Sequence, residues 1–295
     1  MAGRFGTVIT AMVTPFDAKG ALNVDGAVKL AKWLTDNGTD GLVLAGTTGE
    51  GPVLTDEEDL ELWRTITEAV TVPVVAGTGT NDTRHTIELT KLAEQAGVAG
   101  ALVVTPYYNR PGQAGLEAHF RAVAESTSLP ILLYDIPIRA GRKIAHETFV
   151  ALSGVKNIVG VKDAALDPSG SAKLRAAMPE SFEIYSGDDD QTLALMATAG
   201  AVGVVSVASH WAGPEIAEMI AAFEKGDVIG ARELNGRLVP SWEFRGTDAA
   251  PSPLPTKAMM RVLGHDVGQC RLPLGDTPAG LEDEARKLLA TLQRG

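Results

Sequence analysis

Short apolar runs alternate along this chain with longer amphipathic stretches. The runs are rich in β-branched residues and apolar on both faces, which is typical of strands that are covered on both sides. Eight such runs predict eight strands, at residues 7–13, 41–46, 73–79, 100–106, 130–137, 158–164, 182–188 and 202–208.

The stretches between the runs have helical spacing. The clearest predicted helices span residues 24–38, 55–70 and 82–97. Thr55 is followed three residues later by Glu58, which is the pattern of a capping box at a helix start. Gly38, Gly97 and Gly200 close their stretches, as expected at helix C-termini.

Eight strand–helix units within residues 1–225 predict an α/β fold, a (β/α)8 TIM barrel. The order of the strands is not visible in a sequence, so an open doubly wound sheet remains the structural alternative. The segment GTGTND (77–82) lacks the third glycine of a dinucleotide-binding fingerprint, and the chain has no P-loop motif. The barrel is therefore the favoured fold.

Helical sequence continues after the eighth predicted strand, starting with residues 213–227 and interrupted by the proline-rich segment 250–255. The chain has no flexible Gly/Ser linker in this part. We expect residues 226–295 to form a C-terminal helical extension that packs on the barrel.

Composition narrows the class of protein. The chain has 295 residues, 45% hydrophobic and 21% charged, as in ordinary soluble globular proteins. Its net charge of -11 argues against binding to nucleic acid or to an anionic membrane surface. No apolar run approaches the roughly 18 residues of a membrane span, and residues 1–15 resemble a first strand more than a secretory signal. A single cysteine, Cys270, suits a reducing compartment and is expected to be a packing residue. We expect a cytoplasmic protein.

Lys162 lies near the end of the sixth predicted strand, IVGVKDA. In a barrel of this type the chemistry is found at the C-terminal ends of the strands. Alternation divides the strand into two faces, one with Ile158, Gly160 and Lys162 and the other with Val159, Val161 and Asp163. Asp163 is therefore not expected to pair with the lysine. The lysine is either a structurally paired or snorkelling residue, or an amine nucleophile, because burial disfavours the ammonium form. We favour the nucleophile.

Other polar residues follow the strands. Tyr134, near the end of the fifth strand, needs a hydrogen-bond partner but could also relay protons beside the lysine strand. The loop AGTTGEG (45–51) is either a tight turn or a backbone site for a carboxylate or phosphate. The segment TPYYNRP (105–111), with two adjacent tyrosines, is typical of an interface. The segment SGDDD (186–190) is interpreted as an acidic first turn of the next helix. The scattered histidines form no evident metal site.

The motifs AGTTGEG, VTPYYNRP, YDIPIRAG, VGVKDA and YSGDD occur in an order and spacing that resemble the dihydrodipicolinate synthase family of pyruvate-dependent class I aldolases. The resemblance covers essentially the whole chain, including the C-terminal segment PSPLPTK. It implies condensation of pyruvate with L-aspartate 4-semialdehyde to 4-hydroxy-tetrahydrodipicolinate, the first committed step of diaminopimelate and lysine biosynthesis. It implies no metal or organic cofactor.

The resemblance also assigns catalytic roles. Lys162 would form a Schiff base with pyruvate, Tyr134 would shuttle protons, and Thr47 would belong to the same proton relay. Tyr108 would be inserted into the site by a neighbouring subunit, which implies a homotetramer or at least a tight dimer.

Substrate binding is implied for four further residues. Thr48 would help to hold the pyruvate carboxylate, and Arg139 would bind the carboxylate of the semialdehyde. Gly187 and Val205 would also contact substrate.

The chain departs from the family pattern in two places. Asp135 and Ala140 stand where many members have Asn and Thr, and we expect little effect on the chemistry because Asp135 alternates away from Tyr134. Asp56, Asp59 and His85 stand where lysine-inhibited members often carry two histidines and a glutamate. We therefore expect weak or absent feedback by L-lysine.

Two other functions remain open at this stage. One is another pyruvate-dependent aldolase or lyase, acting on N-acetylneuraminate or a keto-deoxy sugar acid. Arg139 and Tyr108 argue against it, since a sugar would call for neutral side chains that bind hydroxyl groups. The other is a non-catalytic keto-acid-binding paralogue, which is disfavoured by the joint presence of Lys162, Tyr134, Thr47 and Tyr108.

Overall fold

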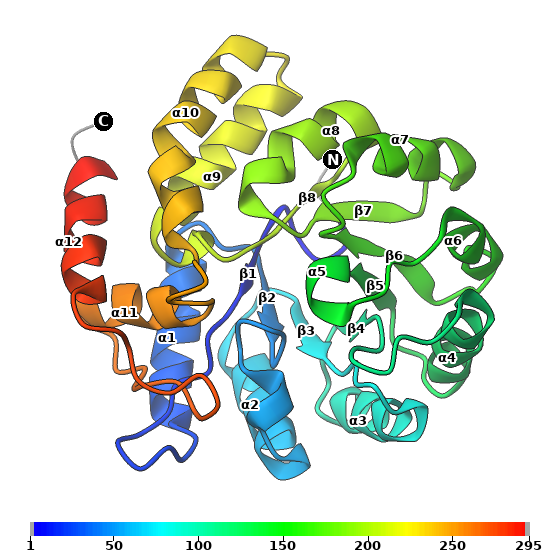
Figure 1. Cartoon of the computed structure of the whole chain (residues 1–295), viewed down its shortest axis with the longest axis horizontal. Coiled ribbons are helices and arrows are strands. Elements are labelled where there is room, and N and C mark those ends of the chain that lie inside the picture. The colour runs from blue at the N-terminus through cyan, green and yellow to red at the C-terminus, as the bar shows by residue number, and fades with distance from the viewer. Residues whose placement is uncertain (1–2, 293–295) are drawn as a thin grey trace.

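The computed structural model describes residues 3–292 as a closed barrel of eight parallel strands with helices around it (Figure 1). The strands pair in sequence order, and β8 pairs with β1. The closed sheet confirms the (β/α)8 prediction and excludes the open sheet. The strands are β1 (Val8–Ala11), β2 (Gly41–Leu44), β3 (Val74–Gly77), β4 (Gly100–Val104), β5 (Ile131–Asp135), β6 (Ile158–Asp163), β7 (Glu183–Ser186) and β8 (Gly203–Ser206).

Alternate residues of the strands fill two separate cores. Inward side chains form a cluster that includes Ile9, Val43, Val75, Leu102, Leu132, Tyr185 and Val205. Outward side chains belong to the larger core beneath the helices. Each strand therefore has a buried apolar face on both sides, which explains why the sequence runs lack a polar face.

The barrel helices cover the outward faces. They are α1 (Val24–Asp36), α2 (Asp56–Ala69), α3 (Thr83–Gln95), α4 (Gln113–Glu125), the short α5 (Pro137–Ala140), α6 (His146–Leu152), α7 (Pro168–Ala177), α8 (Thr192–Ala199) and α9 (Ser209–Glu224), with 3-10 turns η1 (Gly51–Val53) and η2 (Asp189–Gln191). The capping box of Thr55 and Glu58 is confirmed. Gly38, Gly97 and Gly200 all have positive φ after their helices, as expected for helix C-termini.

Helix α9 begins at Ser209, four residues before the predicted stretch at 213–227. Ala212 has non-helical angles (φ -133°, ψ 29°), so the helix is kinked there. Pro214 follows the kink, at a point where a missing backbone N–H costs little. The sequence pattern thus identified the part of the helix beyond the kink and missed the turn before it.

The helices α10 (Val228–Phe244), α11 (Leu254–Val262) and α12 (Leu281–Leu292) follow the barrel. Helix α10 packs on α9, and α12 packs on α10 and α11. The proline-rich segment 250–255 separates α10 from α11, as expected. The division into a barrel at 1–225 and an extension from 226 stays a prediction.

The acidic segment 186–190 has partners that the sequence did not reveal. Asp188 and Asp190 form ion pairs with Arg245 at the end of α10, at 2.9 and 3.1 Å. Asp189 is buried and accepts hydrogen bonds from the Ser206 hydroxyl and from the backbone N–H of residues 207 and 208. The acidic first turn belongs to η2 and not to α8, and its carboxylates hold neighbouring elements together.

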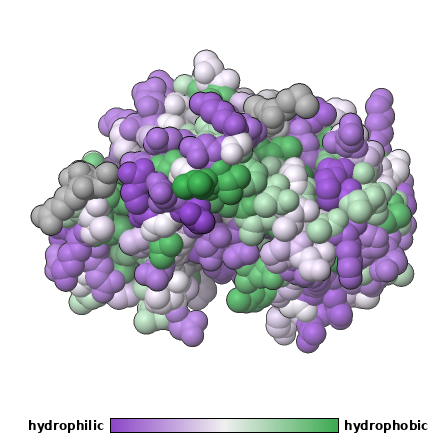
Figure 2. Space-filling model, turned by 90° about the horizontal axis from the view of Figure 1, so that it is seen from above, coloured by the Kyte–Doolittle hydropathy of each residue, from purple (hydrophilic) through white to green (hydrophobic). Residues whose placement is uncertain are grey.

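The surface carries few large apolar side chains. In Figure 2, hydrophilic and apolar residues are mixed on the face that is shown. Between residues 3 and 292 the large exposed apolar residues include Tyr108, Ile138 and Leu166, in segments that follow β4, β5 and β6. No helix in this described range is both long and apolar enough to cross a membrane. Cys270 is buried in a small apolar cluster, and burial raises the pKa of its thiol to about 12.

The start of β6 corrects one prediction. The register between β5 and β6 shifts after the pair Ile131 and Ile158, so that Leu132 lies opposite Gly160. Ile158 consequently belongs to the outer core and does not share the face of Lys162. From Gly160 onward the alternation holds.

Asp163 points away from the barrel interior, as predicted. Its carboxylate accepts hydrogen bonds from the Ser171 hydroxyl at 2.5 Å and from the backbone N–H of Ala165 at 3.0 Å. Asp135 is its partner on β5, buried and hydrogen-bonded to the backbone N–H of Ile144 at 3.1 Å. Burial raises the pKa of Asp135 to about 7, and the nearby Asp163 adds to this shift.

The raised pKa of Asp135 predicts a pH-dependent stability. The folded carboxyl group holds its proton up to about pH 7, whereas the ordinary value is 3.8. The folded state therefore loses stability as the pH rises from about 4 to about 7, and the loss persists above that range. Asp135→Asn keeps an oxygen for Ile144 without the charge. At pH 8 we expect the variant to be more stable by ~2–4 kcal/mol, at 1.36 kcal/mol per pKa unit, with little difference near pH 4.

Urea unfolding at several pH values measures this difference. Asp167→Asn is the control of opposite sign, because the Lys143 ammonium lowers the pKa of Asp167 and the pair stabilises the fold only above that pKa. A stability difference for Asp135→Asn that does not change with pH would contradict the assignment.

Candidate active site

Lys162 and Tyr134 meet inside the mouth of the barrel. They lie opposite each other in the pairing of β5 with β6, and each is only 5% exposed. The Lys162 Nζ atom lies 4.2 Å from the centroid of the Tyr134 ring, within the range of a cation–π contact. No carboxylate in residues 3–292 lies within 4.0 Å of this amine. The lysine is neither paired with an acid nor snorkelling to the surface.

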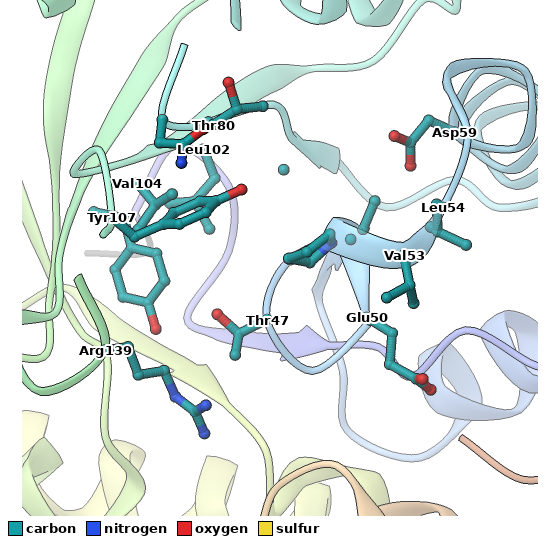
Figure 3. A pocket seen from close by; sticks show the side chains of 18 of the residues that line it. Thr47, Glu50, Val53, Leu54, Asp59, Thr80, Leu102, Val104, Tyr107 and Arg139 are labelled. Carbon is teal, nitrogen blue, oxygen red and sulfur yellow. The ribbon is translucent and has the colours of Figure 1, made fainter. Parts of the chain in front are cut away.

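A cavity of about 530 Å³ opens at the C-terminal ends of β2 to β5. Thr47, Tyr107, Tyr134 and Arg139 are among the residues that line it. Lys162 does not line the cavity, but it contacts Tyr134, which does. Figure 3 shows Tyr107 and Arg139 at one side of the cavity and Asp59 at the opposite side, with Thr47 between them.

The loop at residues 45–51, here called the β2 loop, is a tight turn. Ala45 and Glu50 both have positive φ, at 53° and 57°. The backbone N–H of Gly51 donates to the carbonyl of Gly46 at 3.1 Å, and that of Glu50 donates to the carbonyl of Thr47 at 3.2 Å. The turn interpretation is therefore confirmed, and the carboxylate-binding interpretation stays a prediction. Thr47 lines the cavity, whereas Thr48 is buried and does not.

Arg139 lies on the short helix α5 directly after β5. The helix ends at Gly141, which has φ 71°. Arg139 is exposed and lines the cavity, and no acid of the described chain forms an ion pair with it. An unpaired guanidinium at a cavity wall can bind an anionic ligand. Ala140 lines the same wall and is buried.

The structure separates Tyr108 from the other predicted catalytic residues. Tyr108 is 89% exposed, has φ 72°, and does not line the cavity. The adjacent Tyr107 does line it, and burial raises the pKa of the Tyr107 phenol. Sequence reasoning missed Tyr107. The signal that could have found it is the pair of adjacent tyrosines in PYYNRP, because the side chains of neighbouring residues point in different directions.

Gly187 lies beside the end of the lysine strand and Val205 lies on β8, and neither is on the cavity wall. The backbone N–H of Gly187 donates to the carbonyl of Asp163 at 2.7 Å. A Cβ atom at Gly187 would lie 2.7 Å from the Cβ of Ala164, so the site requires glycine. Val205 is buried in the inner cluster on β8.

The wall opposite Arg139 carries Asp56, Asp59 and His85. The His85 Nε2 and Asp56 Oδ1 atoms are 2.9 Å apart. Asp59 is buried, and this burial, with the charges of Asp56 and Glu58, raises its pKa to about 8. The fold thus brings Asp56, Asp59 and His85 to one wall. Weak feedback by L-lysine stays a prediction.

Comparison with known proteins gives a consistent result. The Dihydrodipicolinate synthetase family matches residues 4–293. The 4-hydroxy-tetrahydrodipicolinate synthase of Acidothermus cellulolyticus is 52% identical over 277 residues, which is 93% of this chain and 88% of the relative. The crystal structure of a dihydrodipicolinate synthase from Bacillus anthracis is 45% identical and covers 99% of both chains with a TM-score of 0.92.

A dihydrodipicolinate synthase from Acinetobacter baumannii, solved in complex with pyruvate, is 35% identical and has a TM-score of 0.91, covering 98% of this chain and 99% of that one. These relatives confirm the resemblance seen in the motifs. With the family match spanning nearly every residue, the chain belongs to the dihydrodipicolinate synthetase family of class I aldolase-type lyases.

Proposed function

We propose that this enzyme condenses pyruvate with L-aspartate 4-semialdehyde to form 4-hydroxy-tetrahydrodipicolinate, the first committed step of the diaminopimelate and lysine pathway. The observation that carries the proposal is the amine of Lys162, buried beside Tyr134 without a carboxylate partner. The free guanidinium of Arg139 at the adjoining cavity and the names of the relatives support it.

The chemistry begins with attack of the Lys162 amine on the ketone carbon of pyruvate. A C–N bond forms, the ketone oxygen leaves as water, and the product is an iminium ion. The iminium withdraws electrons from the neighbouring methyl group, which loses a proton to give an enamine. The enamine carbon then attacks the aldehyde carbon, whose oxygen takes up a proton and becomes a hydroxyl group. The amine of the semialdehyde attacks the regenerated iminium carbon and closes the ring, and the bond to Lys162 breaks so that the free lysine amine leaves. Tyr134 is the proton carrier for these steps, with Thr47 as the next member of its relay.

Each substrate carboxylate has its own binding site. The β2 loop, with the Thr48 hydroxyl and nearby backbone N–H groups, holds the carboxylate of pyruvate. Arg139 holds that of the semialdehyde, since its planar fork matches a carboxylate in two hydrogen bonds. Gly187 and Val205 contact the substrate from the β7 and β8 side.

Tyr108 completes the proton relay of a neighbouring subunit in a homotetramer, or at least in a tight dimer. Its exposure leaves the phenol free to reach a neighbouring subunit, and its positive φ is a strained conformation of the kind found at functional sites. Ile138 and Leu166 are also exposed, in the segments after the next two strands. An acidic chain with one buried cysteine suits the cytoplasm.

The alternative with the same first step is a sugar-acid aldolase. It would share Lys162 and Tyr134 and differ in how the second substrate is bound. The unpaired Arg139 favours a short carboxylated aldehyde. Cleavage of N-acetylneuraminate without activity on the semialdehyde would favour the alternative.

Borohydride trapping tests the nucleophile. With pyruvate present, wild-type enzyme should gain the mass of one reduced pyruvate on Lys162, and turnover with both substrates should be measurable. Lys162→Ala should lose the adduct and roughly a thousandfold or more of the turnover. Lys143→Ala is the matched control, because this exposed lysine pairs only with Asp167 and should leave both readouts unchanged. A pyruvate adduct that persists in Lys162→Ala would contradict the assignment of Lys162 as the Schiff-base nucleophile.

Mixed subunits test whether Tyr108 acts in a neighbouring site. Tyr108→Phe and Lys162→Ala are each expected to be nearly inactive alone. After mixing and reassembly, a heterodimer contains one site with an intact lysine and an intact partner tyrosine. Random pairing should restore about a quarter of wild-type activity, since half of the dimers are mixed and each has one good site. Mixtures that stay inactive after verified subunit exchange would show that Tyr108 does not act in the site of the neighbouring subunit.

A further inference from the structure

One buried ion pair connects the C-terminal helices to the β2 loop. The Lys257 Nζ atom on α11 lies 2.6 Å from the Glu50 Oε1 atom, and both side chains are at most 1% exposed. Lys257 also donates a hydrogen bond to the carbonyl of Gln269 at 3.0 Å. The two residues of the pair are far apart in sequence, so the contact joins the first quarter of the chain to its last.

Glu50 has partners at its backbone N–H and at both carboxylate oxygens. Its backbone N–H donates to the carbonyl of Thr47, which closes the turn that carries Thr47 and Thr48. Its second carboxylate oxygen, Oε2, accepts a hydrogen bond from the backbone N–H of Arg271 at 2.9 Å. With φ at 57°, Glu50 adopts a left-handed conformation that a residue with a side chain avoids unless its surroundings impose it. Lys257 and Arg271 are those surroundings.

The same segment holds the rest of the loop. Lys257 Nζ and the Arg271 guanidinium carbon each lie 4.1 Å from the centroid of the Phe16 ring. The Arg271 guanidinium donates hydrogen bonds to the Glu58 carboxylate at 2.5 and 2.7 Å and to the carbonyl of Val53 at 2.8 Å. The β2 loop, η1 and the start of α2 are therefore fixed by one stretch of the C-terminal extension.

A buried ion pair attaches a helix to a barrel at a high cost in free energy, because both charges lose their hydration. Apolar residues of similar volume usually hold buried elements together equally well or better. A charged pair differs from an apolar contact because it is directional, and it fixes the carboxylate of Glu50 at one position. The Glu50 position in turn fixes the turn from Thr47 to Glu50.

We infer that Lys257 is a positioning residue for catalysis, which holds Thr47 and Thr48 in place through Glu50. The inference rests on the proposed function, because it concerns the loop assigned there to pyruvate and to proton transfer. Lys257 itself does not line the cavity and touches no reacting atom. Its loss should therefore affect the half of the site formed by the β2 loop, and spare the half formed by Arg139 on α5.

The double variant Glu50→Gln/Lys257→Met tests this role without leaving a buried unpaired charge. We expect a folded protein with kcat lowered about tenfold or more and KM for pyruvate raised about tenfold. KM for the semialdehyde should stay within about twofold, since Arg139 is not held by the loop. The rate of borohydride-trapped adduct formation at fixed pyruvate should fall in parallel.

Arg261→Met is the matched control. Arg261 lies one turn further along α11 and binds Glu282, Gly268 and Thr277, all within the C-terminal extension. This variant should lower the melting temperature and leave kcat and both KM values unchanged. A role of Lys257 in stability alone would make the two variants behave alike.

If the double variant does not fold, Glu50→Gln answers the same question. The glutamine oxygen can still accept from the Arg271 backbone N–H, and its amide nitrogen can donate to the amine of Lys257 once this buried lysine loses its proton, so no unpaired charge remains. The inference then requires KM for pyruvate to rise at least about threefold. Kinetics identical to wild type in whichever variant folds overturn the inference, whereas a wild-type enzyme without turnover of the two substrates overturns the proposed function itself.

Discussion

The parallel register of β5 and β6 is the constraint on which the candidate site depends. It sets Tyr134 opposite Lys162 and Asp135 opposite Asp163, so that the amine and the phenol share the barrel interior and the two acids share the outside. A slip of one residue that set Lys162 opposite Asp135 would place a carboxylate beside the lysine. The carboxylate would favour the ammonium form of Lys162, and a nucleophile would become an ordinary structural lysine.

Most of the strands and helices could be predicted from the sequence, because each is specified by residues that are neighbours in the chain. Apolar runs, the capping box at Thr55 and the glycines after helices each reflect a preference of a few neighbouring residues. The alternation that separated Lys162 from Asp163 is of the same kind. It failed at Ile158 because the register shift there depends on how β6 meets β5, which no pattern within β6 records.

The parts that sequence reasoning missed depend on residues far away in the chain. Asp188 and Asp190 looked like a helix start, but their partner Arg245 lies at the end of α10. Glu50 lies in the loop motif AGTTGEG, and its partner Lys257 lies in the motif PSPLPTK in the last quarter of the chain. The resemblance in motifs predicted a catalytic role for Tyr108, but in a single chain that side chain is exposed to solvent. Pairings of this kind are set by the closed barrel and by assembly.

The attachment of the β2 loop also bears on the order in which the protein is made. The eight strands of the barrel are complete at Ser206, and the helix that follows the last of them ends at Glu224. The residues that restrain Glu50 are translated later, at positions 257 and 271. A nascent chain can therefore close its barrel before Glu50 meets these two partners. The turn that carries Thr47 gains the contacts from Lys257 and Arg271 only when most of the polypeptide has been made.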